Sequence, residues 1–454
     1  MRRASLLLAL VVAGCGGGRP SARLDAEAQS YRAGEPGFAA DAVATVRDGE
    51  TGVDLALGVP PSSLVFQESG DSLVAVARWT VRVQAPGRPD RAASPVDTVS
   101  VRTNAQARDP RPVWRTVRVP VPPGVYGVAV TLEDRASERT ARRELQVEVF
   151  APSDRPDLSA IRLEAATGRG LGPVDAASVP AGLDSLRAVT QVAAAPDGAE
   201  VVLSVVRLRS DQEPAPPLVA ATPARGSLLR RGVDATQIDT VGVVRQRVGP
   251  LDAARDVRAP LPALTPGVYT VRLDLVGPGG GALDTESRTV VVRRRDYPAL
   301  TRLGDLAEPL VYLGGEREVE AIVQAEGAGQ RAAFDRFWGE RLDDRRLAAA
   351  TVRAYYDRVE EANRQFSAYK EGWKTDPGMV LILFGPPRYI EATPEGERWV
   401  YAQGGAAPPF FAFEQTAGRP GGSGLFSVLT LVRDRAYAEA WERARVQWRS
   451  GIVP

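Results

Sequence analysis

The alternation of apolar and polar positions divides the chain into a β-rich part and a helical part. From about residue 40 onward, short runs alternate with a period of two and are separated by Gly, Pro or Asp; residues 72–83 and 113–119 are two such runs. This alternation is typical of half-buried antiparallel strands. Because several such runs follow one another within about 110 residues, the pattern predicts a β-sandwich.

A short repeat indicates that two such modules follow one another. The tetrapeptide Pro-Gly-Val-Tyr at residues 123–126 recurs at residues 266–269, and each copy opens an alternating run that leads to another β-prone run. Pro-Gly predicts a type II turn in which the glycine takes a positive φ. We therefore predict two β-sandwich (Ig-like) modules of related design, at residues 38–152 and 153–296. The alternative is that the tetrapeptide is a generic hairpin edge that arose twice by chance.

The apolar period changes to that of an α-helix in the last third of the chain. Phe334, Phe337 and Trp338 fall on one face of a predicted helix. A second stripe of apolar residues from 352 to 366 predicts another helix, which we expect to end near Gly372. Both stripes are more typical of faces packed into a core than of a cofactor site.

Predicted strands follow these helices. The apolar run at residues 379–384 has no polar interruption, which predicts a strand buried on both faces. Further strands are expected at about residues 398–402, 410–414 and 426–432, before a last amphipathic helix. Helices packed over a short antiparallel meander predict an α+β domain at residues 297–454. The predicted fold class is a multidomain chain with two β-sandwich modules followed by this α+β C-terminal domain.

The N-terminus has the pattern of a lipoprotein signal. Two arginines precede a short apolar run at residues 6–12, and the sequence Val-Ala-Gly-Cys that ends at Cys15 is similar to the bacterial lipobox, whose cysteine is lipidated. The apolar run is too short to span a bilayer. We predict a signal peptide at residues 1–15, lipidation of Cys15 and a flexible tether at residues 16–37. The alternative is an ordinary secretory cleavage site with an incidental cysteine.

Lipidation of Cys15 predicts a place in the cell. Acyl chains on Cys15 would attach the chain durably to a membrane, so we expect a membrane-anchored lipoprotein of the cell envelope. The residue after the cysteine is Gly16 and not the aspartate of inner-membrane retention signals. This difference favours the outer membrane.

Composition excludes several classes of chemistry. The chain has no histidine and a single cysteine, which excludes Ser–His and Cys–His nucleophiles, Cys/His metal sites and a disulfide within the chain. The formal net charge of +1 gives no field that would attract nucleic acid. We therefore expect no cofactor, no metal and no nucleic acid. The charged run Arg-Arg-Arg-Asp at residues 293–296 is expected to be a solvated strand end, with a partner-binding patch as the alternative.

One catalytic pattern is present but incomplete. Ser367 and Lys370 match the S-x-x-K motif, and Lys374-Thr375 is similar to the start of the K-T-G motif of serine acyl-enzymes. The third position of the second motif is Asp376 instead of glycine, and the two motifs lie only a few residues apart. We therefore predict no acyl-enzyme site here, and a pair of carboxylates for glycoside hydrolysis stays open because the separation of two carboxylates is three-dimensional.

The region after residue 371 resembles the GWxTD domain of bacterial envelope proteins. The resemblance covers about residues 300–454, and Pro377 departs from it where the family more often has a basic residue. It implies a family without an established activity. The residues that carry the resemblance, and that we take as candidate site residues, are Gly372, Trp373, Thr375, Asp376, Gly378, Gly385, Pro386, Pro387, Trp399 and Tyr401.

The motif is predicted to serve folding first. Trp373 is expected to seal the joint between the preceding helix and the predicted strand. The tetrapeptide that starts at Asp376 has the composition of a type II turn, with Gly378 at the position of positive φ. Asp376 would then accept local backbone hydrogen bonds. Asp376→Asn is expected to be mild, because the amide oxygen keeps the acceptor while the charge is lost. The alternative is that Asp376 is an acid, a base or a ligand.

Two functions from different classes follow. The preferred one is a structural or protein-interaction role, in which the anchored chain holds its C-terminal domain near the membrane to engage another envelope protein. The alternative is a glycan-binding or weakly hydrolytic envelope enzyme that uses the Trp/Phe-rich C-terminal domain. Exposure of Trp399, Phe410, Phe411 and Phe413 beside carboxylates would favour the alternative, and their burial would favour the structural role.

Overall fold

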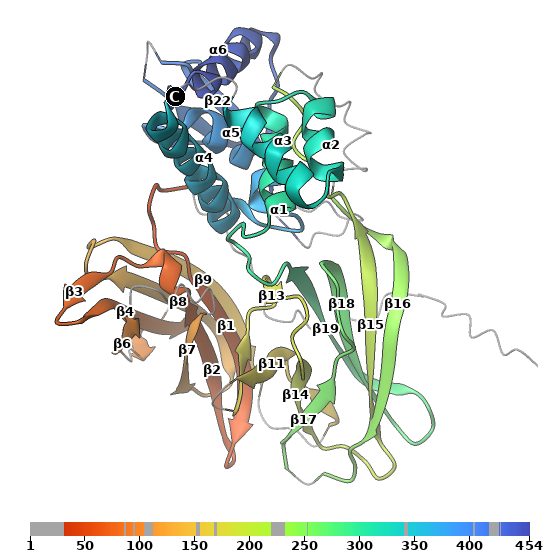
Figure 1. Ribbon diagram of the computed structural model, residues 1–454. Helices are drawn as coiled ribbons and strands as arrows, with labels where there is room; N and C mark the ends of the chain where they lie inside the picture. The colour runs from red at the N-terminus through yellow and green to blue at the C-terminus, as the bar shows by residue number, and fades with distance from the viewer. Residues whose placement is uncertain are drawn as a thin grey trace, which may run out of the picture.

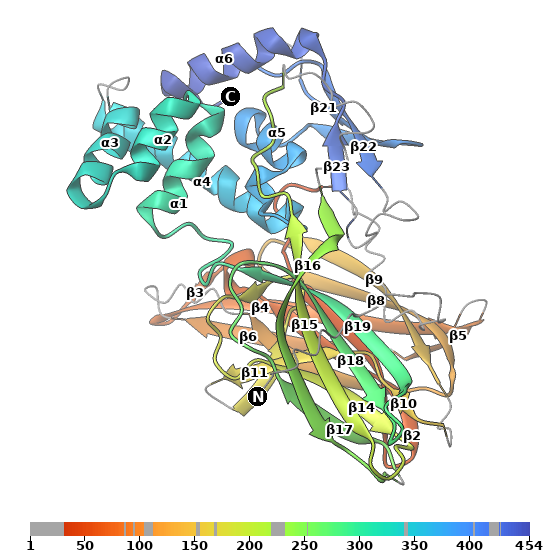
Figure 2. The same cartoon turned by 90° about the vertical axis from the view of Figure 1, so that its right-hand side faces the viewer.

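Two β-rich modules lie side by side, and a helical C-terminal domain lies across one end of both (Figure 1; Figure 2). The computed structural model describes residues 31–85, 88–93, 96–103, 112–150, 155–167, 170–218, 232–251, 253–339, 344–402, 405–416, 426 and 428–454. The predicted signal peptide, Cys15 and most of the predicted tether lie outside these residues. We call residues 38–152 module 1 and residues 153–296 module 2.

Module 1 consists of two antiparallel sheets that share one apolar core. One sheet has the strand order β1-β2-β7, and the other has the order β3-β4-β8-β9 with β5 and β6 also paired to β4. Period-two alternation buries Trp79 and Val81 of β4 against Leu55 of β2. The strands are β1 (Ala39–Arg47), β2 (Glu50–Val59), β3 (Gln67–Ser69), β4 (Ser72–Ala85), β5 (Arg88–Ala93), β6 (Val96–Thr103), β7 (Val113–Pro120), β8 (Gly124–Asp134) and β9 (Thr140–Val149), with a 3-10 turn η1 (Pro61–Ser63).

Module 2 is also built from two sheets around one apolar core. The first has the order β10-β14-β11-β12 with β17 paired to β14, and the second has the order β13-β19-β18-β15-β16. Leu203 of β15 and Leu273 of β18 are fully buried in this core. The strands are β10 (Asp157–Leu158), β11 (Arg162–Thr167), β12 (Gly170–Val174), β13 (Val179–Pro180), β14 (Arg187–Ala193), β15 (Glu200–Ser210), β16 (Val233–Arg247), β17 (Arg255–Pro260), β18 (Gly267–Val276) and β19 (Ala282–Arg293).

The repeated Pro-Gly-Val-Tyr tetrapeptide occupies equivalent places in the two modules. It opens β8 in the ladder β4-β8-β9 and β18 in the ladder β15-β18-β19. The hydroxyl of Tyr126 donates to the carbonyl of Pro122 at 2.8 Å, and that of Tyr269 donates to the carbonyl of Thr265 at 2.8 Å. The glycines do have the predicted positive φ, at +156° and +157°, but these values are far from the roughly +80° of a type II turn. The predicted turn type is therefore wrong, and the glycines begin the strands instead. The tyrosine ties each strand start to the preceding corner.

The two modules are joined by polar contacts between β1 and module 2. The side chain of Gln191 accepts from the backbone N–H of Val46 at 2.7 Å and donates to its carbonyl at 2.8 Å, as a neighbouring strand would. Arg288 forms an ion pair with Asp41 at 2.8 Å. These contacts fix the modules relative to one another at residues far apart in the sequence.

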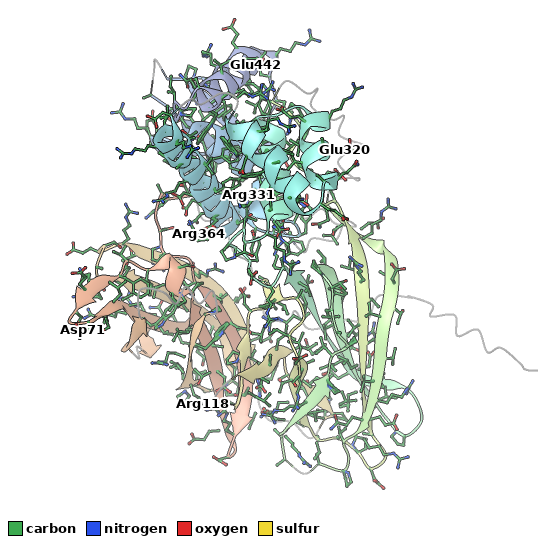
Figure 3. The ribbon with its side chains drawn as sticks, in the orientation of Figure 1. Asp71, Arg118, Glu320, Arg331, Arg364 and Glu442 are labelled. Carbon is green, nitrogen blue, oxygen red and sulfur yellow. The ribbon has the colours of Figure 1, made fainter. Side chains whose placement is uncertain are left out.

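The C-terminal domain packs helices against a four-stranded antiparallel meander of order β20-β21-β22-β23. The predicted helical faces are confirmed, because Phe334, Phe337, Trp338 and Tyr355 are buried in its core, whereas charged residues such as Arg331 lie outside (Figure 3). The elements are α1 (Leu303–Ala307), η3 (Glu308–Tyr312), α2 (Glu316–Gln324), α3 (Gly327–Gly339), α4 (Arg345–Phe366), η4 (Gly372–Lys374), α5 (Asp376–Phe384), β20 (Tyr389–Thr393), β21 (Gly396–Val400), β22 (Phe410–Thr416), β23 (Val428–Leu431), η5 (Arg435–Tyr437) and α6 (Ala438–Arg449).

The strand predicted at residues 379–384 is wrong, because these residues belong to helix α5. Thr375 is the N-cap of α5, and its hydroxyl accepts from the N–H of Gly378 at 3.2 Å. Asp376 and Pro377 occupy the first turn, where an acidic side chain and a proline both favour a helix, and Gly385 with φ of +76° ends it. A helix that is apolar on every side is a buried helix, and the apolar residues of α5 are all buried.

The described end of the predicted tether belongs to the core of the C-terminal domain. Tyr31 is 8% exposed, stacks on Trp399 with 5.5 Å between ring centroids and packs against Phe366 at 5.3 Å. The backbone of Glu35 accepts a hydrogen bond from Gln365 of α4 at 3.4 Å. The segment that precedes module 1 is therefore packed against the C-terminal domain.

Candidate functional site

The GWxTD motif forms a tight joint between α4 and α5. Gly372 opens the 3-10 turn η4, and a Cβ atom on it would lie 1.9 Å from the carbonyl oxygen of Ala362 in α4. A Cβ atom on Gly378 would lie 2.0 Å from the carbonyl oxygen of Gly372. The prediction of a positive φ at Gly378 is wrong, since Gly378 is helical. Both glycines are needed because two backbone segments touch.

The close approach at Gly378 gives a testable prediction. Gly378→Ala should lower the free energy of unfolding by at least the roughly 1–3 kcal/mol typical of overpacking, because a backbone carbonyl cannot rotate away as a side chain can. Gly329→Ala, in helix α3, is the matched control. No atom lies within 4 Å of a Cβ at Gly329, so alanine should stabilise α3 by roughly 0.5–1 kcal/mol. Denaturant unfolding of both variants measures this, and two shifts of the same sign would contradict the packing argument.

Both the buried side chain and the backbone of Trp373 make hydrogen bonds. Its indole N–H donates to a carboxylate oxygen of Glu371 at 2.9 Å, and its backbone N–H donates to the side-chain carbonyl of Asn363 at 3.1 Å. The carbonyl of Trp373 accepts from the hydroxyl of Tyr312 at 2.8 Å. Burial raises the pKa of Tyr312 above its ordinary value, so this hydroxyl stays protonated as a donor.

Asp376 pairs with a buried arginine that lies 57 residues away in the sequence. The guanidinium of Arg433 contacts both carboxylate oxygens, at 2.5 and 3.2 Å. The backbone N–H of Leu431 donates to the same carboxylate at 2.8 Å. The Arg433 side chain is 1% exposed and that of Asp376 is 9% exposed. The prediction that Asp376 caps a local turn is therefore wrong, because it links α5 to the end of β23.

The same residues hold a loop of module 2. We call residues 211–218, which leave β15 and enter the C-terminal domain beside α5 (Figure 2), the clasped loop. Arg433 donates to the carbonyl of Pro216 at 3.0 Å, and the backbone N–H of Ala215 donates to the hydroxyl of Tyr312 at 3.2 Å. Lys370 pairs with Asp211 at 3.1 Å and donates to the carbonyl of Glu213 at 2.8 Å. Leu218 is fully buried in the core of the C-terminal domain.

The remaining motif residues extend the joint toward the sheet. The carbonyl of Gly385 accepts from the hydroxyl of Tyr401 at 2.9 Å, and the indole of Trp399 donates to Glu397 at 3.0 Å. Trp399 and Tyr401 are buried, whereas Pro386 is exposed and Pro387 is partly buried in the link to β20.

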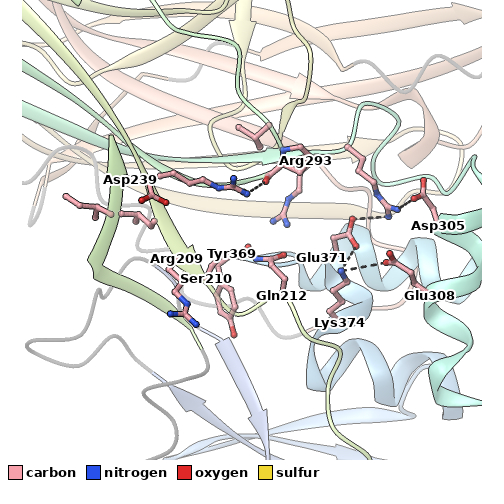
Figure 4. A pocket seen from close by; sticks show the side chains of 17 residues that line it. Arg209, Ser210, Gln212, Asp239, Arg293, Asp305, Glu308, Tyr369, Glu371 and Lys374 are labelled. Atoms are coloured by element: carbon pink, nitrogen blue, oxygen red, sulfur yellow. Dashed lines mark hydrogen bonds and ion pairs between the residues drawn. The ribbon is translucent and has the colours of Figure 1, made fainter. Parts of the chain in front are cut away.

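A cavity of about 810 Å³ lies where module 2 meets the C-terminal domain. Toward the C-terminal domain its charges are paired: Glu371 contacts Lys374 at 3.6 Å and Arg294, at the end of module 2, at 2.9 Å. Figure 4 labels Glu371, Lys374, Asp305 and Glu308 and marks their ion pairs with dashed lines. Arg294 also pairs with Asp305, and Lys374 lies 3.7 Å from Glu308, whose pKa is raised by burial. We call this group the acidic wall.

The arginine run that begins at residue 293 is not a solvated strand end. Arg293 is 4% exposed, its guanidinium donates to the carbonyl of Ala368, and it lies 5.3 Å from the centre of the Tyr297 ring. Arg294 takes part in the acidic wall. The prediction of a solvated run is wrong for these two residues because the C-terminal domain covers the end of β19.

The described residues form no recognisable catalytic group. Ser367 donates to the carbonyl of Asn363 at 2.6 Å, and Lys370 is turned to the clasped loop. Within the described ranges, no three His, Cys, Asp or Glu residues are placed to hold a metal ion. No helix in that part of the chain is both long and apolar enough to cross a membrane. The arrangement can hold segments together, and the groups just described contain no activated nucleophile.

Sequence reasoning missed the partners of the motif. Arg433, Tyr312 and the clasped loop contact the motif from positions that no local pattern connects to it. The polar surroundings of Tyr31 and Arg293 predict solvent exposure, although an aromatic residue within a polar stretch, such as Tyr31, is a usable sign of burial.

Comparison with known proteins supports the domain and little else. The family model of the GWxTD domain matches residues 279–450, so the match begins inside module 2 and includes β19. No curated protein matches the chain. One similar solved structure is a red sea bream transglutaminase (13% identity, 57% of this chain and 31% of that one, TM-score 0.17).

Other similar solved structures are alpha-2-macroglobulins from two bacteria. One is from Escherichia coli, activated by porcine elastase (15% identity, 57% of this chain and 26% of that one, TM-score 0.15). The other is from Salmonella, reacted with methylamine (12% identity, 58% of this chain and 17% of that one, TM-score 0.17). The chain spans less than a third of the length of each of these proteins. What the family model does establish is that residues 279–450 of this chain are a GWxTD domain.

Proposed function

We propose that this chain is a bacterial lipoprotein of the cell envelope, anchored through Cys15, and that its GWxTD domain has a structural or protein-interaction role. The observation that carries the proposal is the use of the motif side chains. Trp373, Thr375 and Asp376 are all buried and make hydrogen bonds or ion pairs within the chain. Side chains committed in this way are unavailable to a substrate, so the motif serves to join the C-terminal domain to module 2.

The position of Tyr31 supports a membrane-proximal C-terminal domain. Tyr31 packs in the core of that domain. At up to about 3.6 Å per residue, the 16 residue steps between Cys15 and Tyr31 reach at most about 58 Å. Lipidation of Cys15 would therefore keep the GWxTD domain within that distance of the membrane, where it could engage another envelope protein, with the outer membrane as the proposed location.

The two β modules fit an Ig-like design within this proposal. Each has two sheets around one core, and in each a tyrosine at a strand start bonds back to a carbonyl four residues earlier. Such a tyrosine corner is a feature of Ig-like sandwiches. Modules of this kind serve as rigid spacers, which agrees with the polar contacts that join module 1 to module 2.

The glycan-binding or hydrolytic alternative has weaker support. Trp399, Phe411 and Phe413 are at most 2% exposed, so they offer no platform for a sugar ring. Phe410 is 42% exposed and Tyr389 is 50% exposed on the same sheet, which are the observations that favour the alternative. The guanidinium of Arg398 lies 4.9 Å from the centre of the Phe410 ring. A sugar that stacked on that face of Phe410 would have to displace it.

Fractionation and cross-linking in cells test the proposal. The wild-type chain should sediment with membranes, and Cys15→Ser should be released or remain an unprocessed precursor. A photo-reactive residue at Tyr389 in the GWxTD domain should form an adduct with another protein, whereas one at Val243, exposed on β16 of module 2, is the matched control. Unchanged processing and partitioning of Cys15→Ser would overturn the anchor. Adducts with glycan instead of protein at Tyr389 would favour the alternative.

A further inference from the structure

The cavity between module 2 and the GWxTD domain is lined by charged side chains of both signs. In the acidic wall, the two cations Arg294 and Lys374 each form ion pairs with carboxylates. The facing side comes from β15, β16, β18 and β19. Arg207, Arg209 and Arg293 line it together with one carboxylate, that of Asp239. Figure 4 shows the guanidinium of Arg293 directed into the space between the two sides. Arg293 therefore presents a positive charge to the cavity that the acidic wall does not pair.

Arg293 is the unusual group, because it is a buried cation without a carboxylate. It makes no ion pair within the described part of the chain, and its Nε atom has no hydrogen-bond partner although it is buried. A guanidinium has five N–H donors, and buried charges are costly unless they are paired. The single carbonyl of Ala368 and the ring of Tyr297 compensate only part of this charge.

Two other buried arginines show how a facing carboxylate changes the pKa of a buried guanidinium. Burial alone would lower the pKa of Arg288 and Arg294, but the carboxylates that face them raise it. The pKa of Arg293 is instead lowered, because burial outweighs the opposing effects of Tyr297, Glu371 and Asp175. An anion placed next to Arg293 would supply the compensation that Asp41 gives to Arg288.

Arg207 provides a second cation at the same side. Its guanidinium donates to the carbonyl of Pro266 at 3.0 Å and makes no ion pair with a described residue. A Cβ on Gly267 would lie 3.1 Å from the Nε atom of Arg207, so the glycine leaves room for this side chain against the strand. Gln212 and Ser210 add neutral hydrogen-bonding groups to the lining.

We propose that this interdomain cavity binds a small organic anion, whose carboxylate or phosphate group pairs with Arg293 and Arg207. An arginine guanidinium suits either a carboxylate or a phosphate, because it can donate two parallel hydrogen bonds to two oxygens of the same group. The volume of about 810 Å³ lies within the range of small-molecule sites and is too small for a folded partner. Because the two sides belong to different parts of the chain, the bound anion also strengthens the contact between module 2 and the GWxTD domain.

Calorimetric titration of the purified full chain tests this site with inorganic phosphate and with succinate, at constant ionic strength. At least one probe should bind saturably, and the better probe identifies the preferred group. Arg293→Gln and Arg207→Gln should each weaken binding at least tenfold. Arg245→Gln is the matched control, since Arg245 lies on β16 of the same sheet with a side chain that is 61% exposed, and it should bind as the wild type does.

Two results would overturn the proposal. One is the absence of saturable binding of either probe to the wild-type chain. The other is wild-type affinity in folded Arg293→Gln and Arg207→Gln variants. If Arg293→Gln does not fold, Arg207→Gln decides alone, because Arg207 is exposed at the cavity and its replacement leaves the core intact. Equal weakening in Arg245→Gln would also contradict the site, because it would indicate a general charge effect.

Discussion

Asp376→Asn should destabilise the GWxTD domain by about 3–5 kcal/mol, the range for breaking a buried ion pair by removing one partner. The substitution keeps one oxygen but replaces the other by an NH₂ group that faces donors. Arg433, with a side chain that is 1% exposed, would keep its charge without the carboxylate that compensates it. Whichever way the amide is oriented, its NH₂ group faces either Nη2 of Arg433 or the N–H of Leu431, so one of these donors loses its acceptor. This outcome is the reverse of the mild effect predicted from the sequence.

The matched control for this substitution is Asp335→Asn on helix α3. Asp335 pairs with Arg331 at 3.2 Å, but the two side chains are 59% and 72% exposed, so the loss should stay within about 0.2–1 kcal/mol. Urea unfolding of both variants, followed by tryptophan fluorescence, gives the comparison. Similar small losses in both variants would show that the Asp376–Arg433 pair does not stabilise the domain.

The same ion pair shows why loss of stability should reach module 2. Arg433 donates to the carbonyls of Pro216 and Pro217 in the clasped loop. These bonds depend on the orientation that the carboxylate gives to the guanidinium. A variant that loses the pair therefore loosens the loop and the adjoining end of β15 together, so the joint and the domain behave as one unit.

The parts of the fold that could be predicted from the sequence are those with a repeating pattern. The stripes around Phe334 and Tyr355 are on helices, and the alternating run at residues 72–83 is strand β4. The apolar run of α5 has no period, so only its ends distinguish a helix from a strand. Thr375, Asp376 and Pro377 are helix-start residues, although the same residue types also fit the turn that the sequence predicts.

The contacts of the candidate site could not be predicted in the same way. Trp373 and Tyr312 are 61 residues apart, and Asp376 and Arg433 are 57 apart. No spacing rule connects such positions, because the packing of the whole domain brings them together. The burial of Arg293 likewise depends on a domain that covers the end of β19, which no feature of the arginine run itself indicates.

Trp373→Ala should lower the free energy of unfolding by about 3–5 kcal/mol, the range for removing a large aromatic side chain from a core. Trp373 is 1% exposed and packs edge-on against Tyr312 with 6.1 Å between ring centroids. The cavity would open where η4 contacts α4 and α5, so the neighbouring backbones could close it only by moving the glycines that hold them together.

Trp373→Phe separates the packing of the ring from its hydrogen bond. Phenylalanine fills most of the site but leaves Glu371 without the indole N–H. Because Arg294 still faces that carboxylate at 2.9 Å, the loss should be smaller, about 1–2 kcal/mol.

Trp114→Ala in β7 is the control for a tryptophan that is only partly buried, and it should cost less than Trp373→Ala. Thermal and urea unfolding of the full chain give the order. A Trp373→Ala variant as stable as the wild type that nevertheless fails to cross-link to a partner would contradict the structural role, because the indole would then act at a binding surface and not in the joint.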